Sequence, residues 1–267
     1  MEASPQTWHH GIVAEWWSNF GDDFRQHEIP YYRAFLEDDG LPALDAGCGS
    51  GRLLIPFLEA GMDVDGCDVS ADMVAVCREK AMRSGLSPNL YVQALHDLDL
   101  PRKYRTIFVC GVWGLGSNRE RDAKALTRLR DHLVPGGTLL VDIEVPYADS
   151  DQWPYWLKDG RDSLPEAHQP NRERRPTADG SELSLSTRIV DLDPLNQHLT
   201  LEIHAERWRD GQLEAEEDRL LDIGLYFKNE MLLMLERAGF RHVVVHGEHE
   251  RVEPTPGDDF LVFVATK

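Results

Sequence analysis

The sequence has little that suits a secreted or membrane protein. Its 267 residues include only four cysteines, and these form no Cys-x-x-Cys pair and no zinc-like spacing. The N-terminus has no apolar run typical of a signal peptide, and no segment reaches membrane-spanning length. We therefore expect a cytoplasmic protein with reduced, buried thiols and no membrane partner.

Basic residues are also scarce. Lys and Arg number 28 against 47 Asp and Glu, which leaves a formal net charge of −19. This negative field repels a phosphate backbone, and the densest basic run, at 172–175, is short and flanked by acids. We therefore expect no nucleic-acid partner. With 42% hydrophobic residues, the chain can still bury the core of a large α/β domain.

The most informative stretch is an apolar strand that runs into a glycine-rich turn. Residues 43–54 are ALDAGCGSGRLL, so that Asp45 precedes glycines at 47, 49 and 51, and a helix follows. Glycine permits a sharp turn and a close approach of the backbone to a ligand. A helix that begins at such a turn directs free N–H groups towards that ligand. The pattern indicates a nucleotide-type cofactor loop at the carboxyl end of a first strand.

Strands and helices alternate through the first half of the chain. After a helical segment at 1–40, we expect strands at 41–44, 62–68, 90–94, 106–110 and 138–143, and helices at 51–60, 71–83 and 119–133. This alternation predicts an α/β fold with a doubly wound, mostly parallel sheet. A helix at 228–238 and strands at 241–246 and 260–265 complete it.

The pattern changes between these two parts. Residues 147–180 are rich in Trp, Pro, Asp and Arg and lack periodicity, which predicts a long lid-like loop. Alternating segments at 183–192, 198–209 and 212–221 are separated by turn signals and predict a small antiparallel meander. The expected division is an N-terminal helical cap (1–40), a Rossmann-like domain (41–146 and 222–267), and a lid with an antiparallel β insertion (147–221).

Together these features resemble the class I S-adenosylmethionine-dependent methyltransferases, in their small-molecule branch. The glycine spacing differs from the G-x-G-x-x-G of nicotinamide enzymes, which would place a third glycine at Arg52. Further matches are Asp68 at the end of the second strand, the Pro-Gly-Gly turn at 135–137 and the segment 235–240. The resemblance covers most of the chain and implies a seven-stranded sheet whose last strand is reversed.

The resemblance also implies S-adenosylmethionine as the cofactor. Asp45 would meet its ammonium group, Asp68 would bind both ribose hydroxyls, and Met73 would cover a face of the adenine. The glycines would let the backbone approach the methionine part. The expected cofactor-binding residues are Asp45, Gly47, Cys48, Gly49, Asp68, Val69, Met73, Leu95, His96 and Cys110.

We expect in-line methyl transfer to a small molecule, because the charge disfavours nucleic acid. The acceptor should lie beyond the fourth and fifth strands, under the insertion. An acidic strand end and an aromatic lid favour a hydroxyl, for instance of a saccharide, and a small amine or aminosugar is the alternative. The expected acceptor-binding residues are Trp16, Tyr32, Trp113, Glu144, Tyr147 and Tyr226.

Glu144 is the first candidate for catalysis, because it ends the fifth strand where open α/β sheets bind ligands. It can act as a general base or, with Asp142, hold Mg²⁺; a helix cap or a salt bridge would explain it equally well. His96 and His249 are further candidate bases. Other histidines that can reach this crevice are His9, His10 and His246.

Two other classes of function remain open at this stage. A nicotinamide-dependent oxidoreductase would use a similar turn, and a non-catalytic protein of the same fold would bind the cofactor without turnover. The exposed edges of the predicted meander also allow a homodimer.

Overall fold

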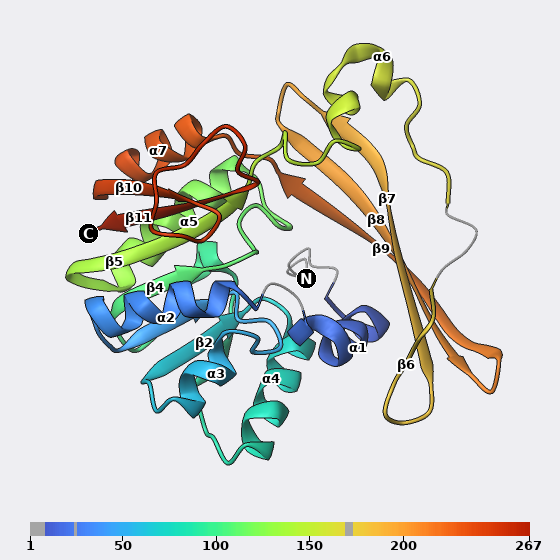
Figure 1. Cartoon of the computed structure of the whole chain (residues 1–267), viewed down its shortest axis with the longest axis horizontal. Coiled ribbons are helices and arrows are strands. Elements are labelled where there is room, and N and C mark those ends of the chain that lie inside the picture. The colour runs from blue at the N-terminus through green and yellow to red at the C-terminus, as the bar shows by residue number, and fades with distance from the viewer. Residues whose placement is uncertain (1–8, 24–25, 169–172) are drawn as a thin grey trace.

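The computed structural model describes residues 9–23, 26–168 and 173–267. A seven-stranded sheet with helices on both faces stands beside a separate four-stranded sheet (Figure 1). The strand order of the large sheet is β10-β11-β5-β4-β1-β2-β3. Its strands are β1 (Ala43–Ala46), β2 (Val64–Asp68), β3 (Leu90–Val92), β4 (Tyr104–Val109), β5 (Leu133–Glu144), β10 (Arg241–Gly247) and β11 (Phe260–Thr266).

The strand directions confirm the predicted topology. β1 pairs in parallel with β2 and β4, and the parallel pairing continues to β3 on one side and β5 on the other. The last strand, β11, runs antiparallel to both of its neighbours, β5 and β10. The order of the strands reverses between β1 and β4, so the connections that leave these two strands go to opposite sides. Their carboxyl ends therefore border a crevice.

Two helices of the large-sheet domain, α4 and α5, begin at a residue whose side chain accepts a hydrogen bond from an N–H group of the first turn. Ser70 accepts a hydrogen bond from the Met73 N–H (3.2 Å), and Asn118 accepts one from the Arg121 N–H (3.0 Å). The helices are α1 (Gly11–Phe20), α2 (Glu28–Asp39), α3 (Leu54–Glu59), α4 (Ala71–Arg83), α5 (Arg119–His132), α6 (Lys158–Arg161) and α7 (Lys228–Arg237). Short 3-10 turns are η1 (Gly21–Asp23), η2 (Leu95–Asp97) and η3 (Trp153–Trp156).

The core lies on both faces of the large sheet. Neighbouring residues of one strand join different clusters: Ile107 packs on the face covered by α5 and α7, and Phe108 packs on the opposite face with Tyr32 and Phe57. All are almost completely buried. Burial on both faces explains why these strands are continuous apolar runs. The four cysteines are free and buried, as predicted.

The four-stranded sheet confirms the predicted antiparallel insertion and extends it. It consists of β6 (Arg175–Pro176), β7 (Glu182–Asp193), β8 (His198–Arg209) and β9 (Gln212–Gly224). β9 continues past the expected end at 221, because residues 222–224 stay paired with β8, and they also contact the loop after β4. The Gly224 N–H donates to the Gly114 carbonyl (2.9 Å), and the Gly116 N–H donates to the Asp222 carbonyl (2.7 Å).

Two expectations about the chain outside the large sheet need correction. The stretch 147–180 is not a plain loop, because η3, α6 and β6 interrupt it. The N-terminal helix α1 does not simply cap the Rossmann-like part, since Val13 and Phe20 pack with Leu183 and Ile203 of the insertion sheet. Figure 1 shows α1 between the large sheet and the four-stranded sheet. Among the described residues, no helix is both long enough and apolar enough to cross a membrane.

The central position of Phe108 predicts a large effect on stability. Replacing it in Phe108→Ala should reduce the free energy of unfolding by about 3–5 kcal/mol, because a large cavity would remain among Tyr32 and Phe57. Urea unfolding followed by circular dichroism measures this change. Leu195→Ala is the control, since Leu195 is 87% exposed and its loss should change stability by less than about 0.5 kcal/mol. Equal effects of the two substitutions would contradict this description of the core.

Candidate active site

The turn after β1 can be built only with glycine at two of its positions. Gly47 has φ +98°, and a Cβ atom there would lie 2.4 Å from a methyl group of Val112. Gly51 has φ +94°, and its Cβ atom would lie 2.8 Å from Ile55. Both the conformation and the space therefore exclude a side chain. The turn is anchored to the neighbouring strand, because the Gly47 N–H donates to the Cys67 carbonyl (2.7 Å).

Asp68, at the end of β2, holds this turn from the other side. Its Oδ2 accepts a hydrogen bond from the Gly49 N–H (2.9 Å), and its Oδ1 accepts one from the Ser70 N–H (2.8 Å). Burial raises the pKa of Asp68, and these backbone hydrogen bonds oppose that effect. Each carboxylate oxygen has a second lone pair. Asp68 can therefore hold the turn and still accept hydrogen bonds from two ribose hydroxyls.

Asp45 is the third of the four residues of β1, shortly before the turn, and is only 2% exposed. Burial raises the pKa of its carboxyl group to about 8, although the positive charge of Arg52 acts in the opposite direction. A neutral carboxyl group at pH 7 gains a charge most easily when a cation arrives beside it. An ammonium group in this position would be such a cation.

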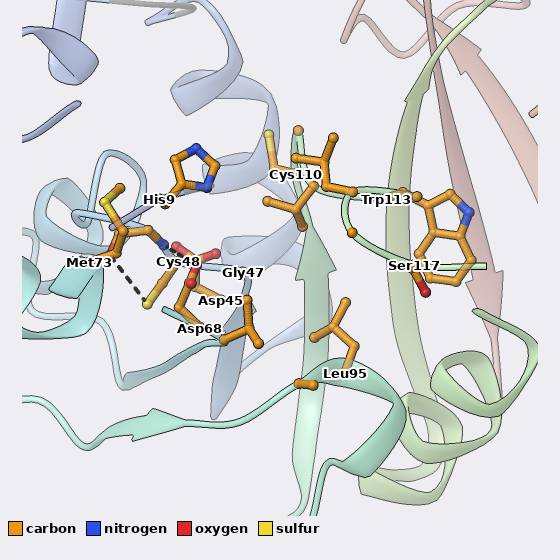
Figure 2. A pocket seen from close by; sticks show the side chains of 18 of the residues that line it. His9, Asp45, Gly47, Cys48, Asp68, Met73, Leu95, Cys110, Trp113 and Ser117 are labelled. Carbon is orange, nitrogen blue, oxygen red and sulfur yellow. Dashed lines mark hydrogen bonds between the residues drawn. The ribbon is translucent and has the colours of Figure 1, made fainter. Parts of the chain in front are cut away.

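A cavity of about 450 Å³, the cofactor cavity, opens at the carboxyl ends of β1 and β4. Its size is within the usual range for small-molecule sites. Figure 2 shows Asp45 and Asp68 close together beside Gly47, with Trp113 farther away, beyond Cys110. All ten residues expected to bind the cofactor line this cavity: Asp45, Gly47, Cys48, Gly49, Asp68, Val69, Met73, Leu95, His96 and Cys110. Their individual contacts with a ligand stay predictions.

The end of the cavity expected to hold adenine is formed by a short segment after β3. Gln93, Ala94, Leu95 and His96 all line it, and burial lowers the pKa of His96. Asp97 does not line it, because this carboxylate points to the surface and lies 2.6 Å from the Lys124 ammonium group. Contact of an adenine edge with backbone groups of this segment stays a prediction, and the acidic side chain that lines the cavity near the start of α5 is Asp122.

A second cavity of about 440 Å³, the acceptor cavity, adjoins the first. Trp113 and Ile223 line both cavities and so form part of the wall between them. Ile223 belongs to the end of β9, which means that the insertion sheet helps to close the site. Most of the charged side chains that line the acceptor cavity are acidic. They are Asp142, Glu144, Asp149, Asp151 and Glu166, and the basic side chain in the described lining is Arg188.

The structure separates the six residues expected to bind the acceptor into two groups. Trp113, Glu144 and Tyr226 line the acceptor cavity. Tyr32 lies in the core, Trp16 packs against Phe20, and Tyr147 is exposed on the surface; none of the three lines either cavity. They are therefore not part of the acceptor site proposed below.

The candidate bases are also separated. Glu144 lines the acceptor cavity and His96 lines the cofactor cavity. His249 lines neither, because it is buried and its Nε2 lies 3.1 Å from an Asp142 oxygen. His246 is held by the Tyr31 hydroxyl (2.8 Å). His9 lines the cofactor cavity, and burial lowers its pKa to about 4, so it is neutral at pH 7.

The pair expected to hold Mg²⁺ does not assemble. The Asp142 carboxylate is buried and accepts a hydrogen bond from the Gly111 N–H (2.6 Å), whereas Glu144 is exposed. Within the described part of the chain, the side chains whose ligand atoms gather around Asp142 are Glu28, Cys110 and His249. Asp142 and Glu144 are two residues apart and project from the same face of β5, but Asp142 lies within the buried run of the strand and Glu144 at its exposed end.

Several residues of the cofactor cavity were missed by sequence reasoning. Arg52 directly follows the last glycine of the turn, and Ser117 and Arg121 lie around the start of α5. The Asn118 cap after the fourth strand was the available signal for the start of that helix. Leu221 comes from β9, and no local pattern could have placed it there.

Comparison with known proteins supports the same kind of domain. Residues 43–137 match the profile of a family described as a methyltransferase domain. A ubiquinone biosynthesis O-methyltransferase from Xanthomonas axonopodis pv. citri is 32% identical over 92 residues, which are 33% of this chain and 38% of that protein. The chain thus spans less than half of the length of this curated relative.

Two solved structures share the fold along nearly the whole chain. An S-adenosylmethionine-dependent methyltransferase from Clostridium acetobutylicum has a TM-score of 0.69 at 16% identity, over 96% of this chain and 97% of that one. The sugar N-methyltransferase KedS8 from Streptoalloteichus sp. has a TM-score of 0.68 at 17% identity, over 100% and 99%. At 16% and 17% sequence identity, the similarity to these two structures establishes a shared fold.

The reversed last strand and the glycine turn at the end of β1 define a class I methyltransferase fold. Within that fold, residues 43–137 are the part of the chain that matches the family described as a methyltransferase domain, in line with the resemblance. A third structure with the same fold, the amino pentose methyltransferase CalS10 from Micromonospora echinaspora, was solved with S-adenosylmethionine bound; its TM-score is 0.62 at 15% identity, over 98% of each chain.

The tight packing around Gly47 predicts that any side chain at this position weakens binding of the cofactor. Gly47→Ala should weaken binding of S-adenosylhomocysteine by about tenfold or more, because its Cβ atom would collide with Val112 beside the cavity. Isothermal titration calorimetry measures the affinity. Gly61→Ala is the matched control: its φ is +76°, and nothing lies within 4 Å of the added Cβ atom. It should lose about 1 kcal/mol of stability and leave the affinity unchanged. Equal affinities of the two variants would contradict the assignment.

The raised pKa of Asp45 predicts that the affinity for S-adenosylhomocysteine depends on pH. Below pH 8 its carboxyl group is mostly protonated, and an ammonium group of the ligand would favour the ionised form. Binding should therefore release a proton, and the affinity for S-adenosylhomocysteine should increase about tenfold or more from pH 6 to pH 8. Calorimetry in two buffers of different ionisation enthalpy counts the protons. Asp45→Asn should bind weakly with no such trend, and a wild-type affinity that is constant over this range would refute the role of Asp45.

Proposed function

We propose that this protein transfers the methyl group of S-adenosylmethionine to a small molecule that carries a cationic amine. The cofactor would occupy the cofactor cavity, and the amine would occupy the adjoining acceptor cavity. The observation that carries the proposal is the acidic lining of the acceptor cavity, next to a site whose glycine turn and carboxylates suit the cofactor.

The cofactor cavity offers a partner for each part of S-adenosylmethionine. Asp45 would face the ammonium group, and Asp68 the ribose hydroxyls. Met73 and Leu95 supply apolar surface for the adenine ring. The methionine end would then point along Cys110 and Gly111 towards the wall that the two cavities share. A methyl group at that wall could be reached from the acceptor cavity.

The charge of the acceptor cavity favours a cation. Arg188, the basic residue among the described residues that line it, donates hydrogen bonds to Glu202 (2.6 and 3.1 Å) and to the Glu166 carbonyl (3.0 Å). The Arg188 charge is thus largely compensated by Glu202. Glu144, Asp149 and Asp151 are exposed at the cavity and keep a negative potential there. Such a potential attracts an ammonium group and repels an anionic acceptor.

The amine must lose a proton before its lone pair can attack the methyl carbon. When the nitrogen–carbon bond forms, the carbon–sulfur bond breaks and S-adenosylhomocysteine leaves. Glu144 lines the acceptor cavity at the end of β5, and its carboxylate could accept the proton or hold the ammonium group before reaction. Trp113, in the shared wall, would bound the space in which the nitrogen approaches the methyl group.

The similar proteins support both an amine and a hydroxyl as the acceptor. KedS8, which matches this chain over its whole length, is described as a sugar N-methyltransferase. The ubiquinone biosynthesis enzyme, which matches a third of the chain, is an O-methyltransferase. A saccharide hydroxyl is therefore the second candidate, with Glu144 as its general base. A cytoplasmic location and a homodimer stay predictions.

Glu144→Gln tests the acceptor site separately from the cofactor site. With labelled S-adenosylmethionine and a panel of aminosugars, small amines and their hydroxyl analogues, the wild type should methylate amines preferentially. The variant should lose about 10²–10⁴-fold in kcat/KM, with an unchanged affinity for S-adenosylhomocysteine. Glu250→Gln removes the same charge at an exposed position outside both cavities and should keep full activity.

The other outcomes of this assay identify the competing functions. Turnover of the hydroxyl analogues alone would replace the amine by the second candidate. Cofactor binding without turnover of any acceptor would favour a non-catalytic protein of the same fold. Tight binding of NADH without binding of S-adenosylhomocysteine would refute the methyltransferase proposal itself.

A further inference from the structure

Four side chains with metal-binding atoms meet in the interior, beside the wall between the two cavities. They are Glu28 at the start of α2, Cys110 after β4, Asp142 in β5 and His249 between β10 and β11. All four are buried, and the two carboxylates are at most 2% exposed. One ligand atom from each residue lies within 4.8 Å of all the others.

The spacing of these atoms resembles that of a four-coordinate zinc site. Zinc bonds of about 2.0–2.3 Å to oxygen, nitrogen and sulfur place neighbouring ligands of a tetrahedron roughly 3.3–3.6 Å apart. The Cys110 sulfur lies 3.2 Å from a Glu28 oxygen and 3.4 Å from an Asp142 oxygen. The His249 Nε2 lies 3.1 Å from Asp142 and 3.8 Å from Glu28. These distances fall close to that range. Glu28 meets Cys110 through Oε2 and His249 through Oε1, so its carboxylate would have to present one of these two oxygens to the ion.

The charges of the group also suit a divalent cation. Two carboxylates and a thiolate would carry three negative charges, and the Arg52 guanidinium, 2.6 Å from Glu28, offsets one of them. A divalent ion would balance the remaining two with His249 neutral. Uncompensated charges are costly to bury, so an ion here would replace repulsion among buried acids by coordination. Zinc accepts this mixture of oxygen, nitrogen and sulfur ligands.

We propose that Glu28, Cys110, Asp142 and His249 form a structural zinc site. Because four protein ligands complete the tetrahedron, no position stays open for substrate. The ion would join α2, β4, β5 and the β10–β11 connection at one point. Asp142 also accepts the Gly111 N–H hydrogen bond, and Gly111 lines both cavities. The site would thus fix the shape of the wall through which the methyl group passes.

The test uses the full chain, treated with a chelator and then titrated with Zn²⁺ or Co²⁺. One equivalent of Zn²⁺ should bind per chain and raise the melting temperature. Co²⁺ should give the intense visible bands of a four-coordinate ion and a sulfur-to-cobalt charge-transfer band. Cys110→Ala should abolish the charge-transfer band, and Cys110→Ala and His249→Ala should each weaken Zn²⁺ binding on the order of 100-fold or more.

Two control variants test whether the metal ion binds at this group of residues and not elsewhere. Cys67→Ala removes another buried thiol, in β2, and should leave the metal affinity and the cobalt spectrum unchanged. His204→Gln removes the histidine of a more exposed group, His204, Glu206 and Glu216, which is the other described cluster that could hold an ion. This substitution should leave unchanged the binding of the one Zn²⁺ ion per chain that raises the melting temperature.

Several results would overturn the proposal. Wild-type protein that takes up no Zn²⁺, or that binds Co²⁺ without a sulfur-to-cobalt band, would show that the group is a metal-free network of ion pairs. Both results are read on the wild type and do not depend on how the variants fold. Binding that depends on His204 but survives loss of Cys110 would place the ion elsewhere. None of these readouts requires a methyl acceptor, so they are independent of the proposed function.

Discussion

The hydrogen bond between the Gly49 N–H and the Asp68 carboxylate is the contact on which the rest of the site depends. It joins the turn after β1 to the end of β2 and, through Ser70, to the start of α4. Gly47 and Gly51 make the turn possible, because no side chain fits at either position. With this turn in place, the reversal of strand order between β1 and β4 leaves a cavity that can accept a nucleoside, and Asp45 is placed at its inner end.

The insertion sheet helps to enclose a second cavity beside the cofactor cavity. Gly224 and Gly116 tie the end of β9 to the loop after β4, so that Ile223 becomes a shared wall. Beyond the wall, acids from β5 and the segment after it meet residues of β7 and β8. The methyltransferase fold thus supplies most of the cofactor cavity, and the insertion, whose sequence follows a different pattern, supplies part of the lining of the acceptor cavity.

The sequence predicted the fold and the cofactor cavity well, because both depend on local patterns. The glycine spacing, Asp68 and the alternation of strands and helices lie in short segments whose meaning does not require distant contacts. The acceptor side depends on which segments meet in space. Tyr32 was expected at the acceptor but packs under Phe108, since helix periodicity does not tell which face of the sheet a helix covers. The group around Cys110 and His249 joins residues far apart in the chain, and no spacing rule connects them.

The most direct test of the two-cavity arrangement is a crystal structure with S-adenosylhomocysteine bound. We predict the ammonium group beside Asp45, the ribose hydroxyls at Asp68, and the sulfur atom directed at the wall formed by Gly111 and Trp113. A ligand in the cofactor cavity whose sulfur points away from the acceptor cavity would contradict this arrangement, and so would a ligand bound outside the cofactor cavity.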